Sequence, residues 1–166
     1  MKTFHGRVLA AGTYHGEAVV THTGFNTLAS CQTSALLATS KKIIVSDQNN
    51  KELYKKNITG KALCLPETIG STTGGMVIQT VAVRNLAPKA WLFSHHIDPL
   101  AASGIILSNV WNDCGLIAID ELGDEFLEAV KTGDTVTPNA LRFFYTRKFR
   151  KTEEKSSCKK DGRNRL

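Results

Sequence analysis

The sequence has 166 residues, of which 42% are apolar and 22% are charged, with a formal net charge of +6. This length and composition suit one ordinary globular domain and exclude a compositionally disordered chain. No apolar run approaches the ~20 residues of a membrane-spanning helix, and the first residues lack the apolar core of a secretory signal. We therefore expect a cytoplasmic protein with no membrane partner.

The positive charge is concentrated at the C-terminal end. Residues 147–166 contain nine Lys or Arg and three Asp or Glu, whereas residues 1–146 contain twelve of each kind. We predict a folded domain over residues 1–140 and a basic, flexible C-terminal extension over residues 141–166. A basic extension can bind nucleic acid, but residues 147–166 have only Phe149 on which a base could stack. We favour a solvated extension over a nucleic-acid-binding one.

The first half of the chain predicts short strands separated by turns and loops. The strands are expected at residues 8–12, 16–21, 42–46 and 61–65. Residues 25–40 are small, polar and weakly periodic, which predicts a loop with one short helical turn. Residues 47–50 are turn-forming types that would end the third strand.

The second half begins with a glycine-rich loop over residues 69–75 that leads into a helix over 76–86. Apolar side chains at 78, 81, 82 and 86 share one helical face, so this helix is expected to be mostly buried, and Pro88 stops it. Further strands are expected at residues 90–93, 104–107, 116–119 and 133–136. Shorter helices are expected at residues 100–102 and 124–132.

Strands outnumber helices in this assignment, and several of them are apolar throughout. Such strands favour a sheet that is covered on both faces, which indicates a mixed α/β fold class. Trp91 and Trp111 are predicted to lie in the core. The four cysteines are widely spaced, which predicts reduced thiols and no ligand spacing for a metal cluster. Cys31 and Cys64 are expected to be buried and inert.

The loop from Gly70 to Gly75 is the strongest candidate site. It precedes a helix N-terminus, where unpaired amides and the helix dipole favour a carboxylate, a phosphate or an oxyanion. Three hydroxyls, those of Ser71, Thr72 and Thr73, lie in the same turn. Neither a Walker A loop nor a dinucleotide-binding glycine pattern is present. An ordinary helix cap and turn, in which Ser, Thr and Gly are also common, is the alternative interpretation.

Five short motifs follow one another in order between about residues 4 and 137. They are Gly6-Arg7-Val8, Gly60-Lys61-Ala62-Leu63, Gly70-Ser71-Thr72-Thr73-Gly74, Ala87-Pro88-Lys89-Ala90 and Asp98-Pro99-Leu100. In this order and spacing the set resembles the aconitase X swivel domain family. The resemblance implies a swivelling β/β/α fold, with a layered, β-rich core and flanking helices.

The same resemblance implies a function, namely the small subunit of a hydro-lyase that dehydrates a hydroxy acid. Ser71 would be the catalytic base that removes a proton next to a carboxylate. Gly70, Thr72, Thr73 and Gly74 would bind the substrate. The resemblance also implies that this chain binds no metal itself. Iron or an iron–sulfur cluster would be held by a large partner subunit, without which this chain would be inactive.

Two other interpretations stay open. The chain departs from the family pattern at residues 24–30 and 50–51, which favours a non-catalytic binding or regulatory domain of the same fold. His95, His96 and Asp98 form a tight group of potential metal ligands. Adjacent strand residues point to opposite faces, so we favour a surface turn over a metal site there.

Overall fold

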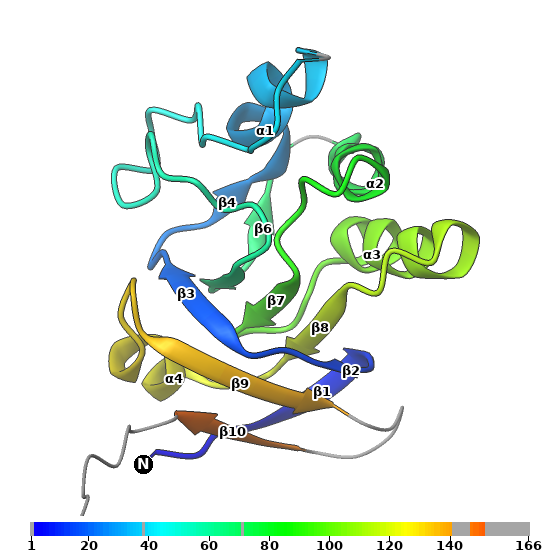
Figure 1. Ribbon diagram of the computed structural model, residues 1–166. Coiled ribbons are helices and arrows are strands. Elements are labelled where there is room, and N and C mark those ends of the chain that lie inside the picture. Colours follow the sequence, from blue (N-terminus) through cyan, green and yellow to red (C-terminus); the bar gives the residue numbers. More distant parts are fainter. Residues whose placement is uncertain (1, 38, 71, 141–146, 152–166) are drawn as a thin grey trace, which may run out of the picture.

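The computed structural model describes residues 2–37, 39–70, 72–140 and 147–151. Within them, eight strands form the main sheet in the order β10-β1-β8-β7-β5-β3-β9-β2, and β9 also pairs with β10, so that the sheet closes on itself (Figure 1). Its strands are β1 (His5–Ala10), β2 (Gly12–Thr13), β3 (Gly16–Val20), β5 (Ala62–Leu65), β7 (Ala90–Phe93), β8 (Ile117–Asp120), β9 (Thr135–Ala140) and β10 (Arg147–Lys151). A small parallel pair is formed by β4 (Phe25–Asn26) and β6 (Thr68–Ile69).

Four neighbouring strands of the main sheet, β3, β5, β7 and β8, run parallel. All residues of β5, β7 and β8 are buried, as their continuous apolar sequences predict for parallel strands covered on both faces. The strands predicted at residues 61–65, 90–93 and 116–119 are thereby confirmed. So is the mixed α/β class, with a β-rich core and flanking helices.

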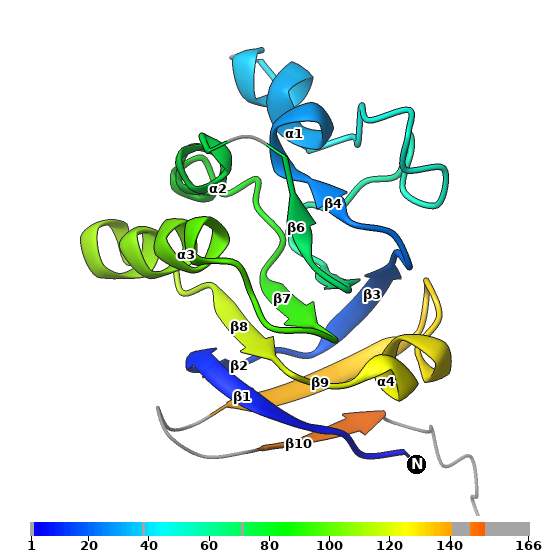
Figure 2. The same ribbon diagram turned by 180° about the vertical axis from the view of Figure 1, so that it is seen from behind.

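Two hydrophobic clusters lie on the two faces of this parallel region. The larger cluster includes Phe25, Trp91 and Phe93 and is covered by α1 (Thr27–Leu36), α2 (Gly74–Val83) and α3 (Pro99–Asn112). The other includes Phe4 and Phe126 and receives α4 (Asp124–Ala129). Figure 2 shows α1, α2 and α3 together on one side of the sheet and α4 on the other. None of the described helices combines the length and the apolar character that crossing a bilayer requires.

The helix predicted after the glycine-rich loop is confirmed, although α2 begins and ends earlier than the expected 76–86. Ile78, Val81 and Ala82 in the helix are buried as expected, and so is Leu86, which follows it. The predicted loop over residues 25–40 is wrong, because residues 27–36 form the ten-residue α1. The inward residues of α1 are mostly small or polar, such as Ser30 and Ser34, and they give no hydrophobic periodicity. Packing in the folded domain thus forms a helix that the sequence pattern of residues 27–36 does not indicate.

The short helix predicted at residues 100–102 is confirmed as part of α3, which is longer than expected. The strand predicted at 104–107 is wrong, because α3 continues through these residues. The residues of α3 that are buried, Ala101, Gly104, Ile105 and Ser108, follow the spacing of one helical face. The apolar run at 104–107 belongs to this amphipathic helix.

The predicted strand at residues 42–46 is wrong as well. Ile43 and Val45 are buried, but among the described residues the segment joins no sheet. It has the isolated antiparallel bridge Ile44–Asn57 and a few backbone hydrogen bonds with residues 55–58.

Candidate functional site

A cavity of about 210 Å³ opens where three helices begin. Thr27, Gly74 and Asp98 line it, and each stands at the start of one of them, α1, α2 and α3 respectively. The remaining wall comes from Thr68, Ile69 and Gly70 at the end of β6, and from Leu100 and Ala101 in the first turn of α3. The cavity is therefore surrounded by the positive ends of three helix dipoles.

The strand order explains why these helix starts meet. In parallel sheets, the segments that leave the carboxyl ends of the strands gather at one edge. The β4–β6 pair aligns Phe25 with Thr68 and Asn26 with Ile69, which places the start of α1 beside the glycine-rich turn. The segment after β7 brings Asp98 to the same edge.

Capping differs among the three helices. The Asn26 Oδ1 atom accepts a hydrogen bond from the Ala29 amide at the start of α1 (3.0 Å). Asp98 Oδ1 accepts from the amides of Leu100 (2.8 Å) and Ala101 (3.1 Å) at the start of α3, while Thr68 Oγ1 donates to Asp98 Oδ2. The N-cap residue of α2, Thr73, makes no capping hydrogen bond with its side chain. The start of α2 also lies at the cavity, through Gly74, and the amides of a helix N-terminus can bind an anion.

Gly70 fits the shape of this turn for two reasons. Its φ of +104° lies in the region that favours glycine. A Cβ atom at this position would also stand 2.6 Å from Asn26 Nδ2. Gly70 thus allows the turn to pass directly over the side chain that caps α1.

The structure places the predicted site residues differently. Gly70 and Gly74 line the cavity. Thr72 and Thr73 are exposed in the turn between β6 and α2 and do not line it. Ser71 lies outside the described residues. The catalytic and substrate-binding roles of all five stay predictions.

Sequence reasoning missed the cavity residues outside the glycine-rich loop, above all Thr27, Thr68 and Asp98. One signal was available, because Asp98-Pro99 has the pattern of an N-cap followed by proline at the first helical position. Thr27 and Thr68 carry no local signal. Their place in the cavity depends on the pairing of β4 with β6.

The described cysteines do not provide a set of cluster ligands. Cys31 and Cys64 are buried in the two different hydrophobic clusters, and Cys114 is partly exposed after α3. None of the three lines the cavity. Burial raises the pKa of the Cys31 thiol to about 12 and also raises that of Cys64. These two thiols are therefore protonated, which makes them poor nucleophiles and poor metal ligands. The prediction that they are buried and inert is confirmed.

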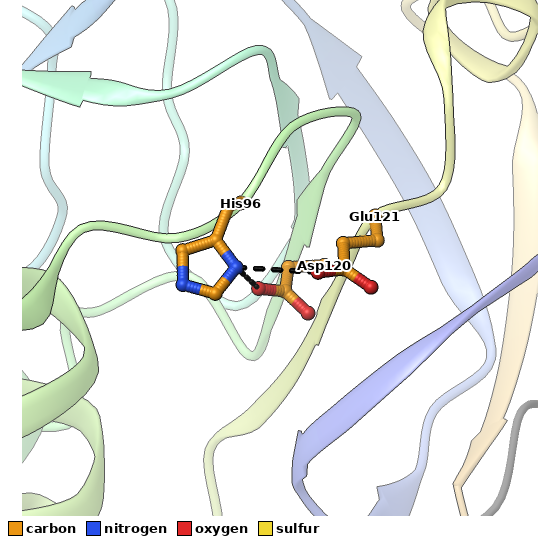
Figure 3. Close-up of side chains that lie close together, drawn as sticks. All are labelled: His96, Asp120 and Glu121. Carbon is orange, nitrogen blue, oxygen red and sulfur yellow. Dashed lines mark hydrogen bonds and ion pairs between the residues drawn. The ribbon is translucent and has the colours of Figure 1, made fainter.

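The histidine pair does not converge with Asp98 on one point. His95 Nε2 lies 2.9 Å from Asp124 Oδ1, while His96 lies beside Asp120 and Glu121 (Figure 3). His96 Nδ1 is 3.5 Å from Asp120 Oδ2 and 3.3 Å from Glu121 Oε1.

The guanidinium of Arg7 already binds the carboxylate of this group. Its Nη2 donates to Asp120 Oδ2 at 2.6 Å and lies 3.0 Å from His96 Nδ1. A cation at the carboxylate would have to displace this guanidinium. The group is therefore better described as an ion-pair network at the end of β8 than as a metal centre.

Comparison with known proteins identifies the family. A family model described as the aconitase X swivel domain matches residues 3–142, which is most of the chain. The chain belongs to the aconitase X swivel domain family.

Curated relatives of this swivel domain include the phosphomevalonate dehydratase small subunits of Methanocella arvoryzae and Archaeoglobus fulgidus. The first is 36% identical over 85 residues, which cover 51% of this chain and 59% of that protein, less than two thirds of its length. The second is 28% identical over 138 residues, which cover 82% of this chain and 92% of that protein.

Solved structures similar to the swivel domain include Thermococcus kodakaraensis aconitase X in its holo-form and a UPF0107 protein determined by solution NMR. The first has a TM-score of 0.69 at 26% identity, over 82% of this chain and 91% of that one. The second has a TM-score of 0.71 at 26% identity, over 92% of this chain and all of that one. The predicted resemblance is thus confirmed.

Proposed function

We propose that this swivel domain is the small subunit of an aconitase-X-type dehydratase that acts on a hydroxy acid. The observation that carries the proposal is the cavity at the starts of α1, α2 and α3, with the signature turn between Gly70 and Gly74 in its wall. This cavity is suited to an anion. Among the described lining residues the one ionisable side chain, that of Asp98, is already engaged in capping α3. A reaction there needs groups from a second polypeptide.

In the proposed reaction, the amides at the start of α2 bind the carboxylate or phosphate of the substrate. The Ser71 oxygen, stabilised as an alkoxide by the helix N-terminus, takes the proton from the carbon next to the carboxylate. The electron pair of that C–H bond forms the carbon–carbon double bond, while the C–O bond on the neighbouring carbon breaks and the hydroxyl leaves, protonated, as water. The iron or iron–sulfur cluster that the family resemblance implies is expected in the large subunit, because the described cysteines of this chain do not gather at the cavity.

The substrate proposal follows from the relatives and from the size of the cavity. The curated relatives are named for phosphomevalonate, a phosphorylated hydroxy acid. A volume of about 210 Å³ is below the ~300–1,000 Å³ of pockets that enclose a whole small molecule. We infer that this chain binds one charged end of the substrate and that the large subunit encloses the rest of it.

Replacement of Ser71 by alanine in the assembled enzyme tests this proposal. We expect Ser71→Ala to lower kcat by about 10³-fold or more, since no other group would accept the proton, while the two subunits still co-purify. Ser40→Ala, a serine whose side chain makes no described contact with the cavity, is the control and should retain full turnover. Normal turnover by Ser71→Ala would remove the serine from the reaction and favour a non-catalytic role for the domain.

A further inference from the structure

The outer face of α2 and α3 is unusual for the surface of a protein. The ten residues of α2 and the fourteen of α3 include no Asp, Glu, Lys, Arg or His. Several large apolar side chains on these helices are nevertheless exposed, namely Met76 (69%), Val83 (52%), Ile106 (39%), Val110 (71%) and Trp111 (68%). A surface helix normally presents charged and polar residues to water. Exposed apolar patches of this kind mark interaction sites, and Met and Trp are enriched there.

The two helices form one continuous surface because they pack closely. A Cβ atom on Gly75 would lie 2.5 Å from the Leu100 carbonyl oxygen, and one on Gly104 would lie 2.5 Å from the Gly75 carbonyl oxygen. At the other end of the pair, Gln79 Nε2 donates to Asn112 Oδ1 at 3.3 Å. Figure 1 shows α2 and α3 side by side on the outside of the sheet.

This outer face is continuous with the cavity. Leu100 is 40% exposed on α3 and lines the cavity, and Ile69, 49% exposed, lines it from the turn before α2. A protein seated on the outer face would therefore also cover the cavity mouth. The outer face and the candidate site are therefore adjacent.

The composition of the outer face indicates what kind of molecule binds it. The C-terminal residues 152–166, with eight charged side chains, do not match a surface that offers no charge to pair with. A second copy of this chain would bring another cavity of the same kind, with Asp98 engaged in capping, and would add no missing group. A different polypeptide with an apolar, uncharged contact surface matches the face and can also bring the groups that the cavity lacks.

We propose that the outer face of α2 and α3 is the docking surface for the large subunit, which closes the cavity as it binds. This inference rests on the proposed function as a small subunit. It adds the position of the interface and the chemistry of the partner surface.

Binding of the aconitase-X-type large subunit from the same genome to the full chain tests the proposal. Val110→Glu and Trp111→Glu each place a charge on the outer face, in the last turn of α3, at a site too exposed to affect folding. We expect each to weaken the Kd by at least about 30-fold, the loss typical of a hot-spot contact. Ile44→Glu makes the same change at an apolar residue that is 42% exposed but lies outside α2 and α3, and it should bind as the unmodified chain does.

The contrary outcomes separate the two proposals. Unchanged binding by both glutamate variants would overturn the docking surface and leave the small-subunit function standing. Failure of the unmodified chain to bind the large subunit would overturn the small-subunit function, and the docking surface with it. A homodimer of the unmodified chain that Val110→Glu dissociates, with binding of the large subunit unchanged, would assign the face to a second copy instead.

Discussion

Two adjacent glycines at the start of α2 have different surroundings. A Cβ atom on Gly74 would meet Thr27 Oγ1 at 3.8 Å, an ordinary contact, whereas one on Gly75 would lie 2.5 Å from a backbone oxygen of α3. Gly74 leaves room above the cavity, and Gly75 allows α2 and α3 to approach each other. Sequence reasoning assigned the cavity role to Gly74 but could not find the packing role of Gly75, because its neighbour Gly104 is distant in the chain.

Serine substitutions at these two positions should therefore differ in effect. We expect Gly75→Ser to lower the free energy of unfolding by about 1–3 kcal/mol, because a backbone atom cannot move aside as a flexible side chain can. Gly74→Ser is the matched control and should change it by less than about 0.5 kcal/mol. Urea titrations of both variants measure the difference. Equal midpoints would show that the two helices can separate at little cost.

At the scale of single elements, α3 depends on one side chain for its start. Asp98 caps the first two free amides of the helix and also accepts the Thr68 hydroxyl from β6. The same residue thus begins a helix and fixes a wall of the cavity.

Removal of this cap should destabilise the domain. We expect Asp98→Ala to lower the free energy of unfolding by about 1–2 kcal/mol, the usual loss when an N-cap residue is replaced by alanine. Asp98→Asn, which can still cap, should restore most of that loss. Thermal unfolding followed by circular dichroism measures both variants. An asparagine variant as unstable as the alanine variant would show that the carboxylate charge, rather than the cap, stabilises α3.

The elements that could be predicted from the sequence are those whose burial is visible in composition. The buried strands β5, β7 and β8 have continuous apolar runs, and α2 has an apolar face, so these were found. In α1 the buried side chains are small or polar, and in α3 a four-residue apolar run resembles a strand. The turn from Gly70 to Gly74 was found by its residue types. That the starts of α1 and α3 lie beside this turn could not be predicted, because they are brought together by the order of the strands and not by any local sequence pattern.

At the scale of the whole molecule, one ion pair links three distant parts of the chain. The Asp120 side chain at the end of β8 is fully buried. It accepts hydrogen bonds from Arg7 Nε and Nη2 on β1 and from the amide of Ile97 in the segment before α3. The hydrogen bond with Asp120 raises the pKa of Arg7. This pair joins the first strand to the segment that leads to the cavity.

Loss of the arginine would leave a buried carboxylate without its counter-charge. We expect Arg7→Met to lower the free energy of unfolding by about 3 kcal/mol. Lys61→Met removes a partly exposed ion pair with Glu17 (2.6 Å) and should cost no more than about 1 kcal/mol. Denaturant unfolding of both variants compares the two pairs. Similar losses would show that burial of Asp120 does not set the cost.

The two tryptophans provide the molecule with separate optical signals. Trp91, expected in the core and found fully buried between Phe25 and Phe93, has an apolar environment that only disruption of the core would change. Trp111 was also predicted to be buried, but 68% of it is exposed at the end of α3. Its indole therefore emits from water in the isolated chain. One fluorophore reports whether the chain is folded, and the other whether anything covers its outer helices.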